Sequence, residues 1–562
     1  MNFLRASGAL LLVSIAASAQ LTQDQKVSDF MQLSAIFAKN YAPYEWKRDA
    51  IKFDLLDLQP WLDRIAQSKT DLDFYEIMSS YAASLQDASA QYVVPSDFTA
   101  DLRFSVDIYD GKVLIDGIDR TALPSRTYPF QVGDEVVSVD GQTAADLVNA
   151  FSNYNTYSNP IARSRFGASL ITFRTQQLMP HAHEIGDTAK VVILRQSGAM
   201  QTFDIPWLKQ GMPLLGVGPV PSPHAVRNKL KAKFAAPSGS VYGTLNTAFA
   251  TRDTTGFEGL KGTLFPGIGP LFGLPAGFKL RLGVGAADEI VTGTYKSGAY
   301  TLGFMRIPDL ALSTNGQREV QSEVAYFQQN TDGLIIDIMG VPSTDFCVEQ
   351  SLLTYLIPHS FGAIGQQVRG TQYWLASYDA ALQSAKDAAA PQWQINLYTK
   401  YLNAVQEAYS ERGGKTGILP FCGPSLSWNP ATDSNGNVVA YTKPITVLTD
   451  EVSVGDIFAA ILQDEGRAQI VGERTSGIGG GALEFDDAGN YSEGIVFVNV
   501  GSLIRNRLIT TPEFPTTNLI ENVGVRPDVK LDFQTKDNLL NNGQTFLNSA
   551  TAAAVAWIQK NQ

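Results

Sequence analysis

The sequence has 562 residues, which at about 150 residues per domain is enough for three to four domains. Its net charge of -12, without a run of like charges, argues against nucleic acid as a partner, because a phosphate backbone selects basic proteins. A hydrophobic content of 44% and a charged content of 17% are typical of a folded chain. Two cysteines and four histidines exclude a Cys-based zinc site or an iron–sulfur cluster, and we expect no metal and no cofactor.

Residues 1–19 have the pattern of a secretory signal peptide. An apolar run from Ala9 to Ala17 ends in the small-x-small sequence Ala17-Ser18-Ala19, although a buried N-terminal helix is the alternative. The run is shorter than the roughly 20 residues that span a bilayer, and no later segment resembles one, so we expect no integral membrane segment. We predict export to the periplasm or the extracellular space, where Cys347 and Cys422 either form a disulfide or stay as two buried thiols.

The remaining chain divides into four segments. Residues 20–100 show apolar residues at helical spacing and predict an N-terminal helical domain. Short β-like runs predict a β module over 101–210, and Gly- and Pro-rich sequence marks 211–298 as a connecting region. Strands alternate with helices over 299–562, which indicates an α/β domain with parallel strands and a helical insertion at 377–411. In the β module, the expected elements in chain order are strands 103–109, 112–115 and 135–139, helix 143–151 and strand 190–196. In the α/β domain, they are strand 300–307, helix 320–329, strand 334–338, helix 349–356, strand 445–448, helix 455–465, strand 469–471 and helix 552–558.

Within the β module, residues 130–142 place a Gly-Asp turn before an alternating strand and end the strand with Asp-Gly. This sequence resembles the signature of PDZ domains, which bind a C-terminal peptide as an added strand at a sheet edge. An ordinary β-hairpin followed by a helix is the alternative.

The sharpest chemical signal is a serine between a predicted strand and a predicted helix. This position exposes the hydroxyl of Ser453 at the carboxyl edge of a sheet. It also leaves the N–H of Val454 at the positive end of a helix, where it can stabilise an oxyanion. However, Ser453 and Asp456 also fit a capping box, Ser-x-x-Asp, which any helix can use for stability alone.

Four stretches, 301–308, 331–337, 448–481 and 520–528, together resemble the tail-specific, or C-terminal processing, serine peptidase family. The resemblance covers most of the mature chain. It implies a multi-domain α/β fold with a crotonase-like (ClpP-like) peptidase domain, and peptide-bond hydrolysis through an acyl-enzyme on Ser453. It also implies polypeptide substrates or C-terminal tails as partners. It does not decide whether the protein forms a homo-oligomer.

The family's general base is altered in this sequence. Bacterial processing peptidases use a Lys in the glycine-rich loop, where this chain has Ile478. The resemblance is closest to the branch of tricorn-type enzymes and the chlamydial protease-like activity factor, which use a Glu and the His of an Asp-x-His segment. Glu521 matches the Glu, but Ser89 stands at the His position, and a serine hydroxyl does not take up a proton at neutral pH. The second interpretation is therefore a catalytically impaired pseudopeptidase that binds polypeptide tails.

The family's second oxyanion donor lies in a paired-glycine loop that reads Asp337–Thr344 here. Pro342 in that loop has no N–H, so the expected donor is the amide of Ser343.

Another histidine could replace the missing base. The four candidates are His181, His183, His224 and His359, of which His359 belongs to the same predicted domain as Ser453. No pair of them has metal-binding helix spacing. A lipid or carbohydrate hydrolase of the α/β-hydrolase type is excluded because the sequence around Ser453 lacks the G-x-S-x-G elbow.

Overall fold

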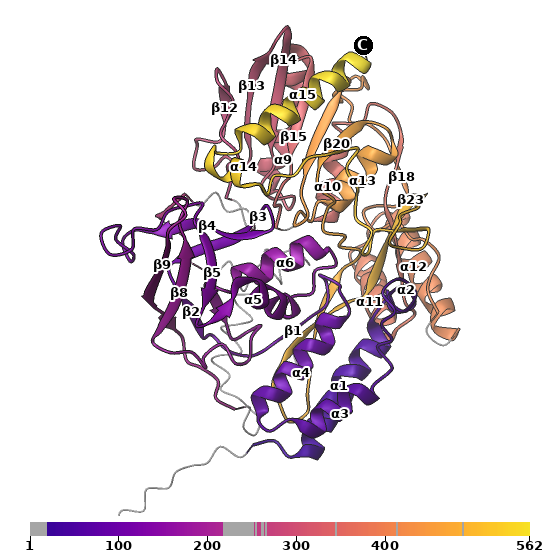
Figure 1. Ribbon diagram of the computed structural model, residues 1–562. Helices are drawn as coiled ribbons and strands as arrows, with labels where there is room; N and C mark the ends of the chain where they lie inside the picture. The colour runs from indigo at the N-terminus through magenta and orange to yellow at the C-terminus, as the bar shows by residue number, and fades with distance from the viewer. Residues whose placement is uncertain are drawn as a thin grey trace, which may run out of the picture.

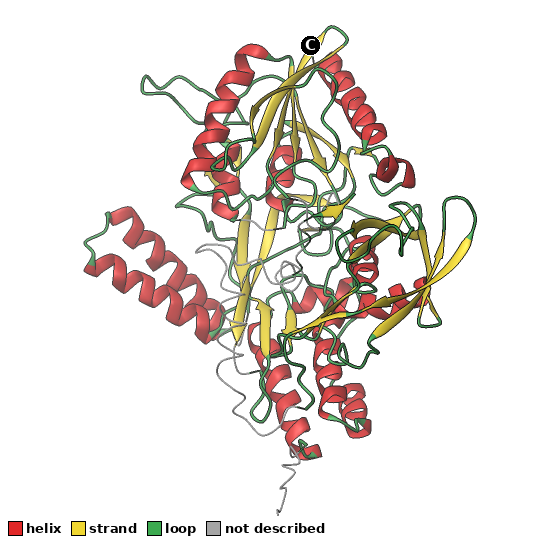
Figure 2. Cartoon of the chain, turned by 90° about the vertical axis from the view of Figure 1, so that its left-hand side faces the viewer, coloured by secondary structure: helices red, strands yellow, loops and turns green. Residues whose placement is uncertain are grey.

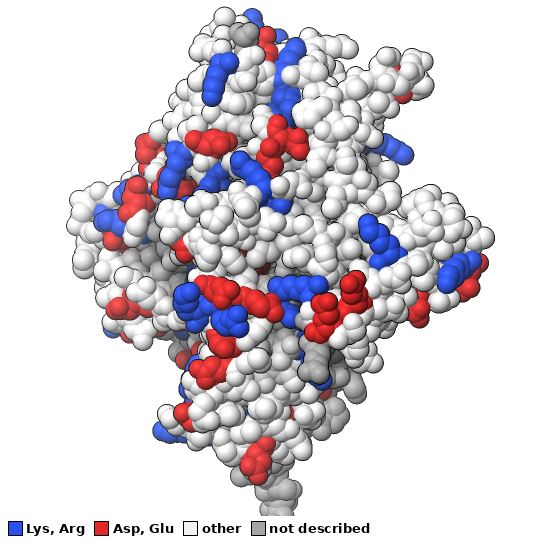
Figure 3. Space-filling model, turned by 90° about the vertical axis from the view of Figure 1, so that its right-hand side faces the viewer, with Lys and Arg blue, Asp and Glu red and all other residues white. Residues whose placement is uncertain are grey.

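The computed structural model describes residues 20–216, 252, 254, 256–259, 264, 267–342, 345–411, 414–485 and 488–561. The predicted signal peptide and about half of the predicted connecting region, including 217–251, lie outside these residues. In Figure 1 the N-terminal helices lie at the bottom, the β module at the left, and the α/β domain with the C-terminus at the top. Within the described residues, no helix combines the length and the apolar character needed to cross a membrane. On the face shown in Figure 3, Lys and Arg side chains alternate with Asp and Glu.

Four helices form the N-terminal part, as predicted: α1 (Gln23–Asn40), α2 (Tyr44–Ala50), α3 (Gln59–Gln67) and α4 (Asp71–Ser84). Helices α1 and α4 begin at Thr22 and Thr70, each of which forms a complete capping box. Their buried aromatic core also contains Val496 and Val498 from the far end of the chain. The reason is that β1 (Gln91–Val93) pairs with β22 (Ile495–Asn499), which pairs with β21 (Ala482–Phe485). No sequence pattern had predicted this pairing.

The β module contains a seven-stranded sheet, and Asp140 and Gly141, both with positive φ, form the tight turn between two of its strands. Two helices and a short 3-10 turn pack beside it. The second helix, 160–169, was not predicted from the sequence. The strands are β3 (Phe104–Tyr109), β4 (Lys112–Asp119), β5 (Glu135–Val139), β6 (Gln142–Thr143), β8 (Thr188–Leu194), β9 (Met200–Pro206) and β11 (Phe257–Glu258). The helices are α5 (Ala144–Phe151), η1 (Ser152–Tyr154) and α6 (Pro160–Ser169). A smaller sheet contains β2 (Thr99–Asp101), β7 (Phe173–Thr175) and β10 (Leu208–Gln210).

The α/β domain is built on a second seven-stranded sheet, whose strands from β14 to β25 run parallel as predicted. Its order is β12 (Lys279–Leu282), β13 (Val291–Ser297), β14 (Tyr300–Arg306), β15 (Gly333–Asp337), β19 (Ile445–Thr449), β20 (Ala468–Gly472) and β25 (Val529–Lys530). The first two strands fall inside the predicted connecting region, so that region is not irregular throughout.

Helices cover both faces of this sheet (Figure 2). Successive strand residues alternate between two cores: Ile335 packs with α15 (Gln544–Lys560), and Ile336 packs with α13 (Asp456–Asp464). The other covering helices are α9 (Thr314–Asn330), α10 (Phe346–Leu353) and the short α14 (Lys536–Leu540). Helix α15 begins eight residues before its predicted start at 552, because Phe546 and Leu547 are buried in the same core as its later turns.

The predicted helical insertion consists of α11 (Gln372–Asp387) and α12 (Gln392–Ser410), which pack against each other. Beside it lie the short strands β16 (Phe361–Gly362) and β18 (Ser427–Trp428), and a sheet of β17 (Gly365–Val368), β23 (Gly501–Ile509) and β24 (Thr517–Leu519). A disulfide between Cys347 and Cys422 joins the start of α10 to the chain after the insertion. The sequence had left open whether these cysteines pair.

Candidate active site

Ser453 lies between the end of β19 and the start of α13, as the strand–serine–helix pattern predicts. Because β15, β19 and β20 are parallel neighbours, the loops that follow all three strands meet at one edge of the sheet. Ser453 therefore sits in the middle of this edge, and its side chain is fully buried.

The hydrogen bonds of Ser453 do not match a capping box. Its backbone N–H donates to the Asp450 carboxylate at 2.9 Å, and its hydroxyl oxygen accepts from the Gly455 N–H at 3.3 Å. Within the described residues, the hydroxyl has no other hydrogen bond. Helix α13 is capped by Gly455, without a side-chain cap bond. The capping-box interpretation is therefore wrong, because the carboxylate of Asp456 is used elsewhere.

Asp456 holds the glycine-rich loop that follows β20. Its carboxylate accepts from the Thr475 hydroxyl, from the Ser476 hydroxyl at 3.1 Å, and from the N–H groups of Gly477 at 3.1 Å and Ile478 at 3.2 Å. Burial nevertheless raises the pKa of Asp456 to about 6. The loop is also tied to the nucleophile segment, because the Ser476 N–H donates to the Ser453 carbonyl at 3.0 Å.

The two proposed oxyanion donors are not both described. The Val454 N–H donates to the Val341 carbonyl at 3.1 Å, so it is occupied in this conformation. The Gly340 N–H next to it donates to the Asp450 carboxylate at 2.9 Å. Ser343 lies outside the described residues. The oxyanion assignment of Val454 and Ser343 stays a prediction, and it requires the Val454–Val341 bond to open.

Glu521 and Ser89 meet at two consecutive glycines of the same loop. The Gly479 N–H donates to Glu521 Oε2 at 3.0 Å, and the Ser89 hydroxyl donates to the Gly480 carbonyl at 2.8 Å. Both side chains are buried. The structure thus gathers Ser453, Glu521 and Ser89 around one loop, but no hydrogen bond joins the Ser453 hydroxyl to either of the other two. Their catalytic roles stay predictions.

The sequence analysis missed Lys47, which forms a buried ion pair with Glu521. Lys47 is 0% exposed, and its ammonium group also donates to the Gln86 carbonyl at 2.9 Å and to Asn522 Oδ1 at 2.8 Å. Its three acceptors match the three N–H bonds of an ammonium group. Lys47 was missed because it lies in the charged sequence of α2, which is typical of a solvated helix.

Burial and the nearby Asp87 carboxylate together raise the pKa of Glu521 to about 8, against the opposing effects of Lys47 and the Gly479 N–H. Asp87 is itself held by the Tyr41 hydroxyl at 2.8 Å and by the Asn499 side-chain amide at 3.0 Å. Asp87 and Glu521, which occupy the positions of the Asp and the Glu in the resemblance, therefore lie in one buried network of hydrogen bonds.

The three candidate histidines that the structure describes do not contact this network. His359 lies 3.4 Å from Glu465, at the opposite end of α13 from Ser453. His181 lies near Asp73 and Glu184, and His183 lies near Gln176. His224 lies outside the described residues.

A cavity of about 640 Å³ opens between the β module and the α/β domain, next to the nucleophile segment. Its wall includes Arg165 of α6 and Glu451, two residues before Ser453. Arg165 is 1% exposed and binds both Glu451 and Asp107 at 2.7 Å. Burial and the Glu451 carboxylate raise the pKa of the adjacent Asp450 to about 7, which Arg165 opposes. The ion pair between Arg165 and Glu451 therefore joins the β module to the segment that carries Ser453.

Comparisons with known proteins agree with this architecture. Residues 99–212 match the family model of the PDZ domain, and residues 378–531 match that of peptidase family S41. An uncharacterized protein of Chlamydia muridarum is 24% identical over 91% of this chain and 89% of its own length. A protein of Chlamydia pneumoniae is 22% identical over 94% of this chain and 90% of its own length.

Among solved structures, the crystal structure of mature CPAF superposes with a TM-score of 0.71 and 19% identity, covering 96% of this chain and 98% of that one. The structure of mature CPAF complexed with lactacystin superposes with a TM-score of 0.70 and 18% identity, over 96% and 99% of the two chains. These matches extend from the N-terminal helices to α15. The chain therefore carries a PDZ domain and a peptidase family S41 domain on a multi-domain α/β fold of the CPAF type.

Proposed function

We propose that this protein is an exported serine-type peptidase that cleaves polypeptides through an acyl-enzyme on Ser453. The observation that carries the proposal is the placement of Ser453 at the carboxyl edge of the sheet, with Glu521 and Ser89 held by the same glycine-rich loop. In the reaction, Ser453 Oγ attacks the carbonyl carbon of the peptide bond, and its proton passes to the leaving amine. Water then releases the acyl group from Ser453.

Two features support export and a polypeptide substrate. The leader-like residues 1–19 and the Cys347–Cys422 disulfide both fit an oxidising compartment outside the cytosol. The PDZ domain offers a sheet edge for an extended tail, and the cavity beside Glu451 lies between that domain and Ser453.

Ser453→Ala tests the nucleophile. We expect the wild-type protein to react covalently with a fluorophosphonate probe and to hydrolyse an unfolded polypeptide such as reduced casein, and the variant to do neither. Ser502→Ala is the matched control, because Ser502 is also buried and its hydroxyl has no hydrogen-bond partner among the described residues. Absence of both labelling and hydrolysis in the wild-type protein would contradict the peptidase proposal.

The second candidate function is tail binding without hydrolysis, and the surroundings of Glu521 favour it. Lys47 donates to one carboxylate oxygen of Glu521 and the Gly479 N–H to the other, so a base at position 89 has to share an oxygen that is already engaged. The hydroxyl of Ser89 is likewise turned to Gly480.

Ser89→His separates the two functions. If only the base is missing, we expect the variant to raise the rate of polypeptide hydrolysis at least tenfold, equal to about 1.4 kcal/mol of activation free energy. Ser89→Asn is the control, since asparagine adds bulk and hydrogen-bonding groups but does not take up the proton. An equal rate in wild type, Ser89→His and Ser89→Asn would show that position 89 does not limit the reaction.

A further inference from the structure

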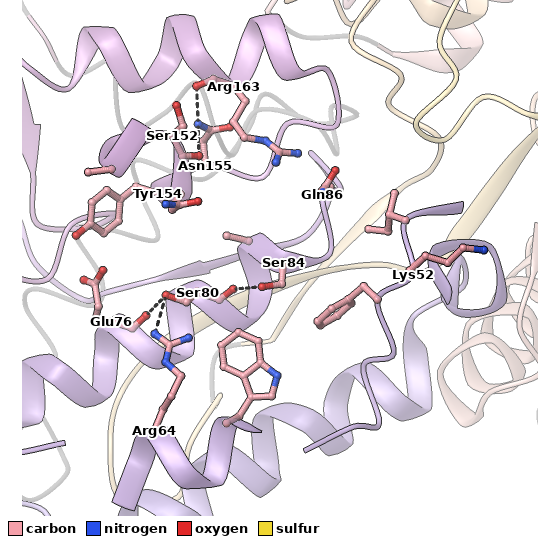
Figure 4. Close-up of a pocket in the computed structure, with 16 residues that line it drawn as sticks. Lys52, Arg64, Glu76, Ser80, Ser84, Gln86, Ser152, Tyr154, Asn155 and Arg163 are labelled. Atoms are coloured by element: carbon pink, nitrogen blue, oxygen red, sulfur yellow. Dashed lines mark hydrogen bonds between the residues drawn. The ribbon is translucent and has the colours of Figure 1, made fainter. Parts of the chain in front are cut away.

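A second cavity, of about 700 Å³, lies between the N-terminal helices and the PDZ domain. Its volume is in the range of ligand-binding pockets, roughly 300–1,000 Å³. Trp61, Arg64 and Glu76 line it from α3 and α4, and Tyr154 and Arg163 line it from the PDZ domain (Figure 4). It is separate from the cavity beside Glu451, with no lining residue in common.

Two guanidinium groups line this cavity without an ion-pair partner among the described residues. Arg163 donates from Nε at 3.0 Å and from Nη2 at 2.7 Å to the Tyr157 carbonyl, which leaves Nη1 without a partner in the described part of the chain. Figure 4 shows its guanidinium on the side of the cavity that faces Gln86. Burial lowers the pKa of Arg163, and no carboxylate offsets this cost. An anionic ligand would supply the missing charge.

On the opposite wall, the Arg64 guanidinium lies over the ring of Trp61, 4.9 Å from its centre, and donates to the Ser80 hydroxyl at 3.4 Å. Among the described lining residues the one acidic side chain is Glu76, and burial raises its pKa, against the opposing effects of a hydrogen bond with Tyr154 and of the nearby His181 and Arg64. The Glu76 Oε2 is buried and has no hydrogen-bond partner among the described residues. The cavity therefore combines cationic groups, an aromatic wall and one unused polar atom.

The rim of the cavity connects to the candidate active site through Gln86. The Gln86 carbonyl accepts from the Lys47 ammonium at 2.9 Å and from the Asn522 side chain at 3.0 Å. Gln86 has a positive φ of 47° and precedes Asp87 directly. A ligand that contacts Gln86 thus contacts the turn that supports the Lys47–Glu521 ion pair.

We propose that this cavity binds a carboxylate group of a polypeptide ligand through Arg163, with an apolar side chain of the ligand against Trp61 and Arg64 on the opposite wall. The proposal rests on the proposed function only in taking the ligand to be a polypeptide. The carboxylate comes either from the C-terminus of the ligand or from an Asp or Glu side chain, and the test distinguishes these two sources.

The test is isothermal titration calorimetry on the full mature chain carrying Ser453→Ala, so that no peptide is cleaved. The probes are acetyl-Ala-Ala-Leu-Ala-Ala with a free C-terminus, the same peptide as its amide, and acetyl-Ala-Asp-Leu-Asp-Ala-amide. We expect at least one carboxylate-bearing peptide to bind tenfold or more tightly than the neutral amide. Tight binding of the first peptide identifies the terminal carboxylate, and tight binding of the third identifies side-chain carboxylates.

Arg163→Gln is expected to weaken this binding at least tenfold, and Arg64→Gln to weaken it less because Arg64 lies on the opposite wall, whereas Arg126→Gln, at an exposed position of the PDZ domain, leaves it unchanged. Unchanged thermal melting of each variant shows that it is folded. Equal affinity for acid and amide peptides, no binding of any peptide, or unchanged binding in both cavity variants would overturn the proposal. Because binding is measured on the Ser453→Ala chain, an inactive wild-type protein would leave this result standing.

Discussion

At pH 9, Lys47→Met is expected to lower the free energy of unfolding by about 3–5 kcal/mol, because above the Glu521 pKa of about 8 it leaves the ionised carboxylate buried without its cation. The methionine fills a similar volume, so the loss measures charge and hydrogen bonding rather than packing. Asn522 Oδ1 and the Gln86 carbonyl also lose the ammonium donor. Urea unfolding followed by circular dichroism measures the effect. Lys39→Met, at an exposed position in the last turn of α1, is the control and should change stability by less than about 0.5 kcal/mol.

The effect of Lys47→Met should depend on pH. The pKa of Glu521 is raised from 4.5 to about 8, so the folded protein holds a proton that the unfolded chain has already lost over this range. Stability from this group therefore falls as pH rises from about 4.5 to 8. Without Lys47 the pKa of Glu521 rises further and the fall continues above pH 8, so the variant should lose more stability at pH 9 than at pH 6. Adding Glu521→Gln should remove this extra pH dependence; if it persists, Glu521 is not its source.

Arg165→Met is expected to cost a similar amount, about 3–5 kcal/mol, because it leaves the carboxylates of Asp107 and Glu451 buried without their common cation. Asp107 belongs to the PDZ domain and Glu451 to the segment before Ser453, so the variant should also weaken the contact between the two domains. Urea unfolding of the variant should then show the PDZ domain separating at a lower urea concentration than the α/β domain.

Two further variants serve as controls for this prediction. Arg165→Lys keeps the charge but not the two-sided guanidinium geometry, and should recover part of the lost stability. Arg318→Met, at an exposed position of α9, should leave unfolding nearly unchanged. A loss of less than 1 kcal/mol in Arg165→Met would show that the three-residue contact does not hold the domains together.

Local sequence patterns predicted much of the fold. The parallel strands around 334–338 and 445–448 are largely apolar and buried throughout, as expected of a sheet covered on both faces. The PDZ-like turn and the position of Ser453 followed from residues that are adjacent in the chain. Helix α15 shows the limit of this approach, since its first two turns are fixed by burial against another segment rather than by local helix preference.

The parts that were missed depend on contacts between distant segments. Lys47 and Glu521 are 474 residues apart, and nothing near Lys47 in the sequence marks it as buried. The pairing of β1 with β22 likewise joins residues about 400 positions apart. The hydrogen bond from Val454 to Val341 changes the interpretation of the oxyanion site, yet it is a matter of loop conformation that residue types alone do not specify.

The pairing of β1 with β22 also constrains the order in which the protein folds. The core of the N-terminal helices includes Val496, Val498 and Val500, which are synthesised long after the helices themselves. Until residue 500 has emerged from the ribosome, these helices lack part of their core and β1 lacks its partner strand. The N-terminal helices therefore cannot complete their packing during synthesis ahead of the PDZ domain, although they precede it in the chain.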